Sequence, residues 1–353
     1  MSKNSAAFLA ALFLAGGLAV PCRAQTAKDV LLAGTRQPTA SFQGRRIVVN
    51  WYGDESHAQE IMVYYRTPGL WRQEILSPAG EVEKVVYQRG GQEWIHDVKE
   101  GTLIHRSPAS LQPGKFDSLQ LSRLLLQNYT PRLKGRKELL SGLPCQMLEL
   151  VPKHPGGPIR ALWIDPGRGI VLKTKQMTAG GTVVSETSFT ELDLEAVPDE
   201  KMFAPPEVSP EQMVEDTPRE PVDGPQELEV RGFDDLPWRT TLPHGFSLDQ
   251  VTLVPLGDDN ALHFRYVDGL SVLSFFVSPR PIDEDGGSGS VEEVGHDDPT
   301  FSFASSVGNI LTWEQSEFHC LLIGDLESAA LKKIRETLID ENATKAEARG
   351  EIP

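Results

Sequence analysis

The sequence of 353 residues is poor in several residue types and patterns, and each shortage excludes a class of protein. Its three cysteines and eight histidines form no cluster with the spacing of a zinc site, so no metal is predicted. After residue 20 no apolar run approaches about 18 residues, so no transmembrane helix is predicted. The 34 Lys and Arg are outnumbered by 50 Asp and Glu, a net charge of −16. This excess of acid argues against a nucleic-acid-binding protein.

Catalytic motifs are also missing. There is no Gly-x-Ser-x-Gly turn, no thiol-protease context around a cysteine, no paired carboxylates and no phosphate-binding loop. The acidic run Asp283–Ser288 resembles a calcium loop only superficially, because Val294 stands where the bidentate glutamate should be. The run is therefore interpreted as an acidic loop. We expect a binding protein, without a cofactor, rather than an enzyme.

The first 24 residues have the pattern of an export signal. Lys3 precedes an uncharged apolar run, Ala6–Val20, and Cys22-Arg23-Ala24 places small residues at the positions required for cleavage before Gln25. The alternative is a buried N-terminal helix, which would need a polar face. The sequence thus predicts a cleavable signal peptide at 1–24 and a soluble, exported protein.

The net charge is distributed unevenly along the chain. Residues 25–200 carry 21 Lys and Arg and 20 Asp and Glu, a net of +1. Residues 201–353 carry 11 and 30, a net of −19. Since complementary charge steers association, we expect a partner to contact the second half through Lys and Arg.

The first half of the chain has the alternating residue pattern of the strands of an antiparallel sheet. Alternating runs such as Arg46–Tyr52 and Ile61–Arg66 are separated by turns, and Gly90-Gly91 predicts a two-residue hairpin. Helical spacing is confined to residues 28–40, ending at Gly34 or before Pro38, and to 116–128. About ten strands with two helices predict a mainly β fold with helices (α+β). Residues 25–204 are expected to form a half-open antiparallel β-barrel with a helical lid.

A proline-rich acidic segment follows. Residues 205–226 are predicted to be an interdomain linker, because proline at this density stiffens a chain and cannot join a sheet. Residues 227–339 then predict a smaller α+β domain of six strands and a closing helix at 327–339. That helix is expected to bury Leu331, Ile334 and Leu338, and residues 340–353 to form a charged, frayed tail. The prolines of the segment are Pro205, Pro206, Pro210, Pro218, Pro221 and Pro225.

Large apolar side chains on the predicted strands of the first domain suggest a ligand site. A curved sheet closed by helices can enclose an apolar cavity. The alternative is that these side chains fill the interior completely, and composition does not separate the two. The residues expected to line such a cavity are Trp51, Met62, Tyr64, Trp71 and Trp94.

The chain after the signal peptide keeps two cysteines, Cys145 and Cys320, one in each half. In an oxidising compartment they could form one disulfide between the halves. Each also lies in an alternating apolar run, where a free cysteine packs as a small hydrophobe. Both interpretations remain open from the sequence.

Several motifs of the first half resemble a known fold. The hairpin Trp163–Lys173 is followed by Gly180-Gly181, by Glu186–Leu192 and by Met202–Pro206. This succession resembles the last hairpins of the outer-membrane lipoprotein carriers (the LolA/LolB group). The N-terminal domain of the RseB/MucB regulators shares that fold.

The second half separates these two groups. Trp238, Leu242–Phe246, Tyr266–Val277 and Gly324–Leu326 resemble the C-terminal domain of the RseB/MucB family, which a plain lipoprotein carrier lacks. The resemblance covers about residues 27–339, and it implies a periplasmic regulator of an envelope-stress sigma factor. Residues 207–226 and 283–298 are more acidic than the family pattern, which leaves the identity of the partner and of the lipid open.

The resemblance implies two kinds of ligand. Family members bind the periplasmic part of a membrane-anchored anti-sigma factor and shield it from proteolysis. Their N-terminal domain is thought to sense lipopolysaccharide or lipoprotein acyl chains, whose binding releases the partner. The alternative function is a periplasmic lipoprotein or acyl-chain carrier or sensor with no anti-sigma partner.

Overall fold

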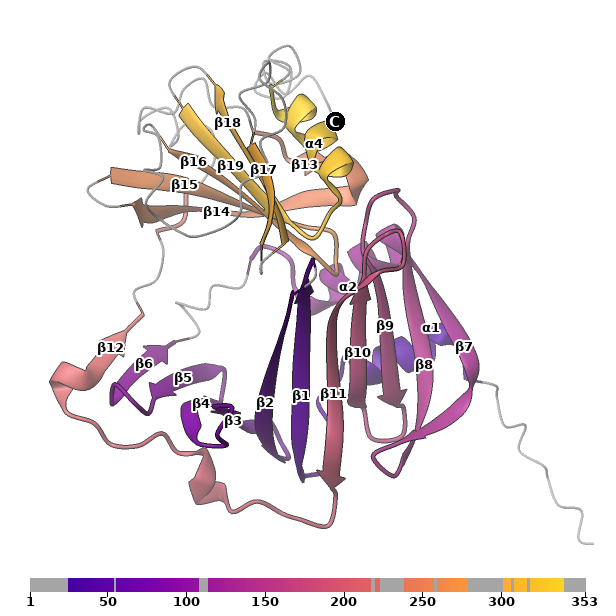
Figure 1. Ribbon diagram of the computed structural model, residues 1–353, viewed down its shortest axis with the longest axis vertical. Coiled ribbons are helices and arrows are strands. Elements are labelled where there is room, and N and C mark those ends of the chain that lie inside the picture. Colours follow the sequence, from indigo (N-terminus) through magenta and orange to yellow (C-terminus); the bar gives the residue numbers. More distant parts are fainter. Residues whose placement is uncertain are drawn as a thin grey trace, which may run out of the picture.

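The computed structural model describes residues 25–53, 55–107, 114–216, 220–222, 238–256, 259–278, 301–305, 308–315 and 318–339. The predicted signal peptide, the acidic run at 283–288 and the tail at 340–353 lie outside these residues. Within them the chain forms a twelve-stranded and a seven-stranded sheet, the lower and upper parts of Figure 1. The mainly β fold with helices that the sequence predicts is confirmed.

The first sheet has the order β12-β6-β5-β4-β3-β2-β1-β11-β10-β9-β8-β7. Strands β1 and β11, far apart in sequence, therefore lie side by side at its centre, with Val48 opposite Thr187. Hairpins join most other neighbours, and Gly90 and Gly91 make the predicted turn with φ of 60° and 79°, values that favour glycine. The strands are β1 (Phe42–Tyr52), β2 (Glu55–Arg66), β3 (Leu70–Leu76), β4 (Val82–Arg89), β5 (Gln92–Asp97), β6 (Thr102–Arg106), β7 (Tyr129–Leu140), β8 (Leu143–Pro152), β9 (Ile159–Asp165), β10 (Ile170–Met177), β11 (Val183–Asp193) and β12 (Met213–Glu215).

Helix α1 (Ala27–Gly34) covers one face of this sheet near β8 and β9. It begins with a capping box between Thr26 and Asp29. It ends at Gly34, where a Cβ would lie 2.7 Å from Cδ1 of Ile164. Buried side chains of α1 pack on the sheet, which gives the domain its predicted helical cover. This cluster contains Val30, Leu31, Leu125, Tyr129, Leu148, Leu150 and Ile164.

A second core cluster uses the alternate residues of the same strands. Along β8 and β9, Cys145 and Trp163 alternate with Leu148 and Ile164, so they project from the opposite face. Their cluster continues to the aromatic group of β1, β2 and β11. Phe42 lies 5.3 Å from Tyr65 and 6.0 Å from Phe189, measured between ring centroids. The first sheet is thus packed on both faces.

The segment predicted as a linker is partly built into both sheets. β12 pairs with β6, with Met213 opposite Leu103, in a parallel arrangement. Val222 donates its backbone N–H to the carbonyl of Val251 in β14. The run Met213-Val214-Glu215 lies between the prolines of the segment and contains none itself. It can therefore pair with β6, and it forms a strand that the proline density of the segment did not predict.

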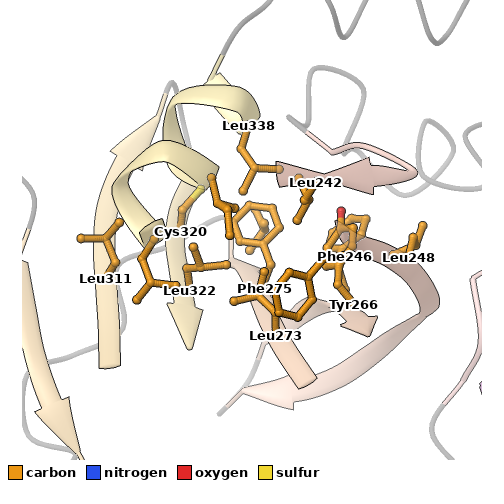
Figure 2. Packing of buried hydrophobic residues seen from close by; sticks show 14 of the residues in the cluster. Leu242, Phe246, Leu248, Tyr266, Leu273, Phe275, Leu311, Cys320, Leu322 and Leu338 are labelled. Carbon is orange, nitrogen blue, oxygen red and sulfur yellow. The ribbon is translucent and has the colours of Figure 1, made fainter. Parts of the chain in front are cut away.

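The second sheet has the order β13-β14-β15-β16-β19-β18-β17 and is covered by α4 (Ser328–Ile339). Helix α4 buries Leu331, Ile334 and Leu338, as predicted. All three belong to the core cluster of this domain, and Figure 2 shows Leu338 pointing toward it. Within the cluster Phe275 stacks on Trp313 with centroids 5.6 Å apart. The strands are β13 (Thr241–Leu242), β14 (Phe246–Leu256), β15 (Asp259–Val267), β16 (Val272–Ser278), β17 (Phe301–Ser305), β18 (Gly308–Gln315) and β19 (Phe318–Gly324).

Candidate functional site

The five residues predicted to line a cavity do not share one face of the sheet. The register of β2 and β3 places Tyr64 opposite Arg72 and Tyr65 opposite Trp71. Trp71 therefore lies on the face of Tyr65, whereas Trp51, Met62, Tyr64 and Trp94 lie on the other face. The structure brings four of the residues to one side and places the fifth in a packed core.

The face that carries Tyr64 is lined by polar groups as well as aromatic ones. The hydroxyl of Tyr64 donates to Glu74 Oε2 at 3.3 Å, and Arg72 donates to Oε1 of the same carboxylate at 2.6 Å. Trp94 stacks on His105 with centroids 5.1 Å apart. These side chains form a hydrogen-bonded layer and not the apolar cavity lining that the sequence predicts.

Part of this face is covered by the chain that follows β11. Arg66 and Arg72 donate to the carbonyls of Pro198 and Met202. The short helix η1 (Glu200–Phe203) packs on β3 and β4 and buries Phe203 completely. The arginines of the strands thus fasten this segment to the sheet.

Trp71 belongs to the aromatic cluster of the opposite face. Its ring lies 4.4 Å from Tyr65 and 5.9 Å from Phe42. The hydroxyl of Tyr65 donates to the carbonyl of Pro38 at 2.9 Å, so the chain after α1 closes this side. Here the side chains pack against one another.

A cavity of about 260 Å³ lies instead over β1, β10 and β11. None of the five predicted residues contributes to it. Its lining combines aliphatic and hydroxyl side chains with two cations. The lining residues are Arg46, Val48, Val171, Leu172, Lys173, Thr174 and Thr187.

Arg46 is the residue of this cavity with the most unusual surroundings. Its Nη2 donates to Gln73 Oε1 at 2.8 Å, and its guanidinium lies 6.0 Å from the centroid of the Phe189 ring. Its Nε is buried and has no hydrogen-bond partner among the described residues. Burial lowers the pKa of Arg46 from its ordinary value, but the group stays charged at neutral pH. A half-buried cation whose Nε–H has no partner among the described residues, beside apolar walls, suits an anionic group carrying an apolar chain.

Lys173, also at the cavity, is already paired. Its Nζ lies 2.5 Å from Glu186 Oε1, and Nζ of Lys175 lies 3.0 Å from Oε2 of the same carboxylate. Lys173 also lies 5.5 Å from the centroid of the Trp163 ring. We therefore assign the anion-binding capacity of the cavity to Arg46.

Sequence reasoning missed this cavity because its residues are spread over three strands. Val48, Thr187 and Thr174 become neighbours through the pairing of β1 with β11 and of β11 with β10. In the sequence, β1 and β11 are separated by most of the first domain, so no local spacing of residues predicts their contact. The one local signal was Arg46 at an apolar-facing position of β1.

Cys145 and Cys320 are both free and buried in the structure. Cys145 belongs to a core cluster of the first domain and Cys320 to the core of the second. Burial raises the pKa of both thiols, that of Cys320 to about 12. The disulfide considered from the sequence is absent here, and both residues pack as small hydrophobes.

The contact between the two domains is a further candidate site, and helix α2 (Ser118–Asn128) lies within it (Figure 1). Asn128 Nδ2 donates to the carbonyls of Gly245 at 3.0 Å and Asp268 at 2.9 Å. The hydroxyl of Tyr129 donates to Asp268 Oδ2 at 2.6 Å. Burial raises the pKa of Asp268 despite this bond, while burial and the Asp268 charge raise that of Tyr129.

The same interface continues on both sides of α2. Before the helix, the backbone N–H groups of Lys115 and Phe116 donate to Asp249, to its carbonyl and carboxylate respectively. On the other side Arg160 pairs with Asp325 at 3.1 Å, and Glu327 donates its N–H to the carbonyl of Gly156. The second domain is thus docked on the first by a set of buried and half-buried polar contacts.

Two further features of the described residues bear on function. They contain no group of three or more His, Cys, Asp or Glu placed to hold a metal ion. None of their helices has the length and apolar character needed to cross a membrane.

Comparison with known proteins agrees with the sequence motifs. Residues 79–214 match the family model described as MucB/RseB N-terminal domain. The curated protein "Sigma factor AlgU regulatory protein MucB" of Pseudomonas aeruginosa is 27% identical over 244 residues, covering 68% of this chain and 70% of that protein.

Solved structures extend the likeness to the whole fold. The Pseudomonas aeruginosa MucA/MucB complex contains a chain with a TM-score of 0.55 and 20% identity, covering 87% of this chain and 94% of that one. A second structure, MucB in complex with MucA(peri), gives a TM-score of 0.50 and 19% identity over the same shares. At this identity these structures establish a common two-domain fold.

Proposed function

Because the chain is a relative of the MucB/RseB proteins, we propose that it is a periplasmic regulatory protein that binds the periplasmic domain of an anti-sigma factor. Through this binding it modulates the envelope-stress sigma-factor response. The observation that carries the proposal is the similarity over both domains to a protein solved with MucA. A carrier of the lipoprotein type would need only the first domain.

The test uses the periplasmic domain of the single-span anti-sigma factor from the same genome. The purified protein from Gln25 onward, without the predicted signal peptide, is titrated with this domain by calorimetry. A complex of defined stoichiometry supports the proposal. Absence of binding at micromolar concentrations, with a folded protein, would leave the carrier or sensor without an anti-sigma partner as the better function.

The charge asymmetry predicts that this association depends strongly on salt. The second half carries a net charge of −19, so a partner rich in Lys and Arg is attracted over distances that salt screens. We expect the association rate constant to fall about tenfold or more between 50 and 500 mM NaCl. Stopped-flow mixing measures it, and a rate that salt leaves unchanged would contradict the electrostatic contact.

We further propose that the first domain senses an acyl chain with an anionic group, held in the cavity at Arg46. The volume of about 260 Å³ is just below the roughly 300–1,000 Å³ typical of small-molecule sites. It suits a short or partly inserted chain. The Arg46 guanidinium would pair with the anionic group, while Val48 and Leu172 contact the chain.

Filling the cavity should abolish this binding. Thr174→Trp places a large ring among the lining residues, and we expect the affinity for a fluorescent fatty acid to fall at least about tenfold. Thr182→Trp, in the exposed turn before β11, is the matched control and should bind as the unmodified protein does. Equal binding by both variants would exclude this cavity as the lipid site.

A further inference from the structure

A histidine pair lies where the two domains meet. His154, between β8 and β9, belongs to the first domain, and His244, in the short helix η3 (Pro243–Gly245), belongs to the second. Their rings pack edge to face, with centroids 6.4 Å apart and an interplanar angle of 84°. Nε2 of His154 lies 3.3 Å from Oδ1 of Asn128, the residue whose amide also binds the second domain.

His244 is held in this place without a hydrogen bond. Both ring nitrogens are buried and have no partner among the described residues. Its φ of 65° lies in the left-handed region, which is uncommon for a residue with a side chain. The following residue, Gly245, is bound through its carbonyl to Asn128. The turn thus presents the imidazole to the first domain.

The charged groups near His244 disfavour protonation of its ring. Lys333 faces it from α4 and His154 from the loop after β8. From α2 comes the uncharged amide of Asn128. The carbonyl of Pro155 favours the protonated ring of His244 and so raises its pKa. It does not form a hydrogen bond with either ring nitrogen. Burial first, then Lys333 and His154, lower the pKa of His244 from its ordinary 6.5.

The direction of the effect follows from linkage. In separated domains the ring of His244 would be hydrated and would titrate near 6.5. In the docked state it binds a proton less readily, so acid favours separation. About one pH unit above 6.5 and higher, the ring is neutral in both states and its protonation no longer affects docking.

We propose that this contact is a pH-sensitive interdomain clasp, in which protonation of His244 in mild acid separates the second domain from α2 and the 153–157 loop. This regulation does not depend on the partner proposed above. At pH 5.0 the docking equilibrium is weakened by at most about thirtyfold, the limit set by an open-state pKa near 6.5.

One other group of the interface responds to acid in the opposite sense. Burial raises the pKa of Asp268, so the docked state takes up this proton more readily and docking gains as the pH falls into the carboxyl range. The measurement is therefore restricted to pH 7.5–5.0. A variant without His244 separates the two contributions.

The experiment measures the distance between the domains in the full protein. Cysteines introduced at the exposed positions Glu100 and Lys332 carry a donor and an acceptor dye, while both native thiols are buried. Energy transfer is followed from pH 7.5 to 5.0, with the radius of gyration from X-ray scattering as a second readout. We expect transfer to change reversibly below pH 6.5 as the radius increases.

His244→Asn is the decisive variant, because asparagine tolerates the left-handed backbone and does not titrate. It should remain docked at pH 5.0, whereas His57→Asn, at an exposed position of β2, should open like the unmodified protein. His154→Gln removes the group of the first domain that opposes a proton on His244 and should shift opening to lower pH, which tests the clasp even if His244→Asn is unstable. Acid opening that persists in His244→Asn, or no change of distance in the unmodified protein, would overturn the proposal.

Discussion

Replacing Gly269 by alanine is expected to detach the two domains at neutral pH. Gly269 lies in the turn between β15 and β16 with φ of 95°. A Cβ there would lie 2.1 Å from the backbone nitrogen and 2.6 Å from the Cα of Leu125, and 2.8 Å from the carbonyl oxygen of Leu121. All three are backbone atoms of α2, which cannot rotate away as a side chain can.

The size of the effect has two parts. The left-handed conformation costs an alanine about 1–2 kcal/mol, and overpacking against backbone adds about 1–3 kcal/mol or more. Together, at about 2–5 kcal/mol, they offset several of the interdomain hydrogen bonds, each of which contributes about 0.5–1.5 kcal/mol, so separation of the domains becomes measurable. Domain separation is read from the energy transfer between dyes at positions 100 and 332, and from urea denaturation.

Gly80→Ala is the matched control for this experiment. Gly80 has φ of 84° in the turn between β3 and β4, and its Cβ would meet no atom within 4 Å. It should lose only the conformational part, about 1–2 kcal/mol, with the domains still docked. If Gly269→Ala kept the energy transfer of the unmodified protein, the close approach of α2 to this turn would be refuted.

The second large effect is expected at Trp313, in the core of the second domain. Its side chain is 1% exposed and stacks on Phe275 with an interplanar angle of 7°. Trp313→Ala removes this stack and leaves a cavity under α4, so the domain should lose about 3–5 kcal/mol of stability. Urea denaturation monitored by circular dichroism measures the loss.

Val272→Ala provides the comparison within the same sheet. Val272 is 43% exposed on β16, so its truncation should cost less than about 0.5 kcal/mol. A loss below about 1 kcal/mol for Trp313→Ala would show that the cluster in Figure 2 is not the stabilising core of the domain.

The features that the sequence predicted correctly depend on neighbouring residues. The Gly90-Gly91 hairpin follows from glycine's access to positive φ, and the buried face of α4 follows from the spacing of Leu331, Ile334 and Leu338. The resemblance to the MucB/RseB family likewise depends on contiguous motifs. Local pattern was sufficient in each case.

The arrangement of the cavity depends on pairing between distant strands. Tyr64 and Trp71 are both large and apolar, but the turn at residues 67–69 sets a register that places them on opposite faces. A shift of one residue there would reverse the result, and composition does not fix that shift. For the same reason Val48, Thr174 and Thr187 gave no signal before the pairing of β1 with β11 was known.

The interdomain contacts were beyond sequence reasoning for a different reason. Asn128, Tyr129 and Asp268 each have an ordinary local context, and their role arises only when α2 lies against the β15–β16 turn. Histidines scattered singly along the chain gave no reason to pair His154 with His244. Contacts of this kind depend on the relative placement of whole domains.

Strand β12 limits how far the domains can move apart. Glu215 is paired with β6, and Pro221 forms a bridge with Thr252 of β14, so six residue steps connect the two sheets. At no more than about 3.3–3.6 Å per residue, six steps can reach at most about 20 Å. A domain released from α2 would swing about this short tether and keep an effective concentration in the millimolar range or above. Return to the docked state would then be an intramolecular step, independent of protein concentration, and the opened protein would reclose without assistance.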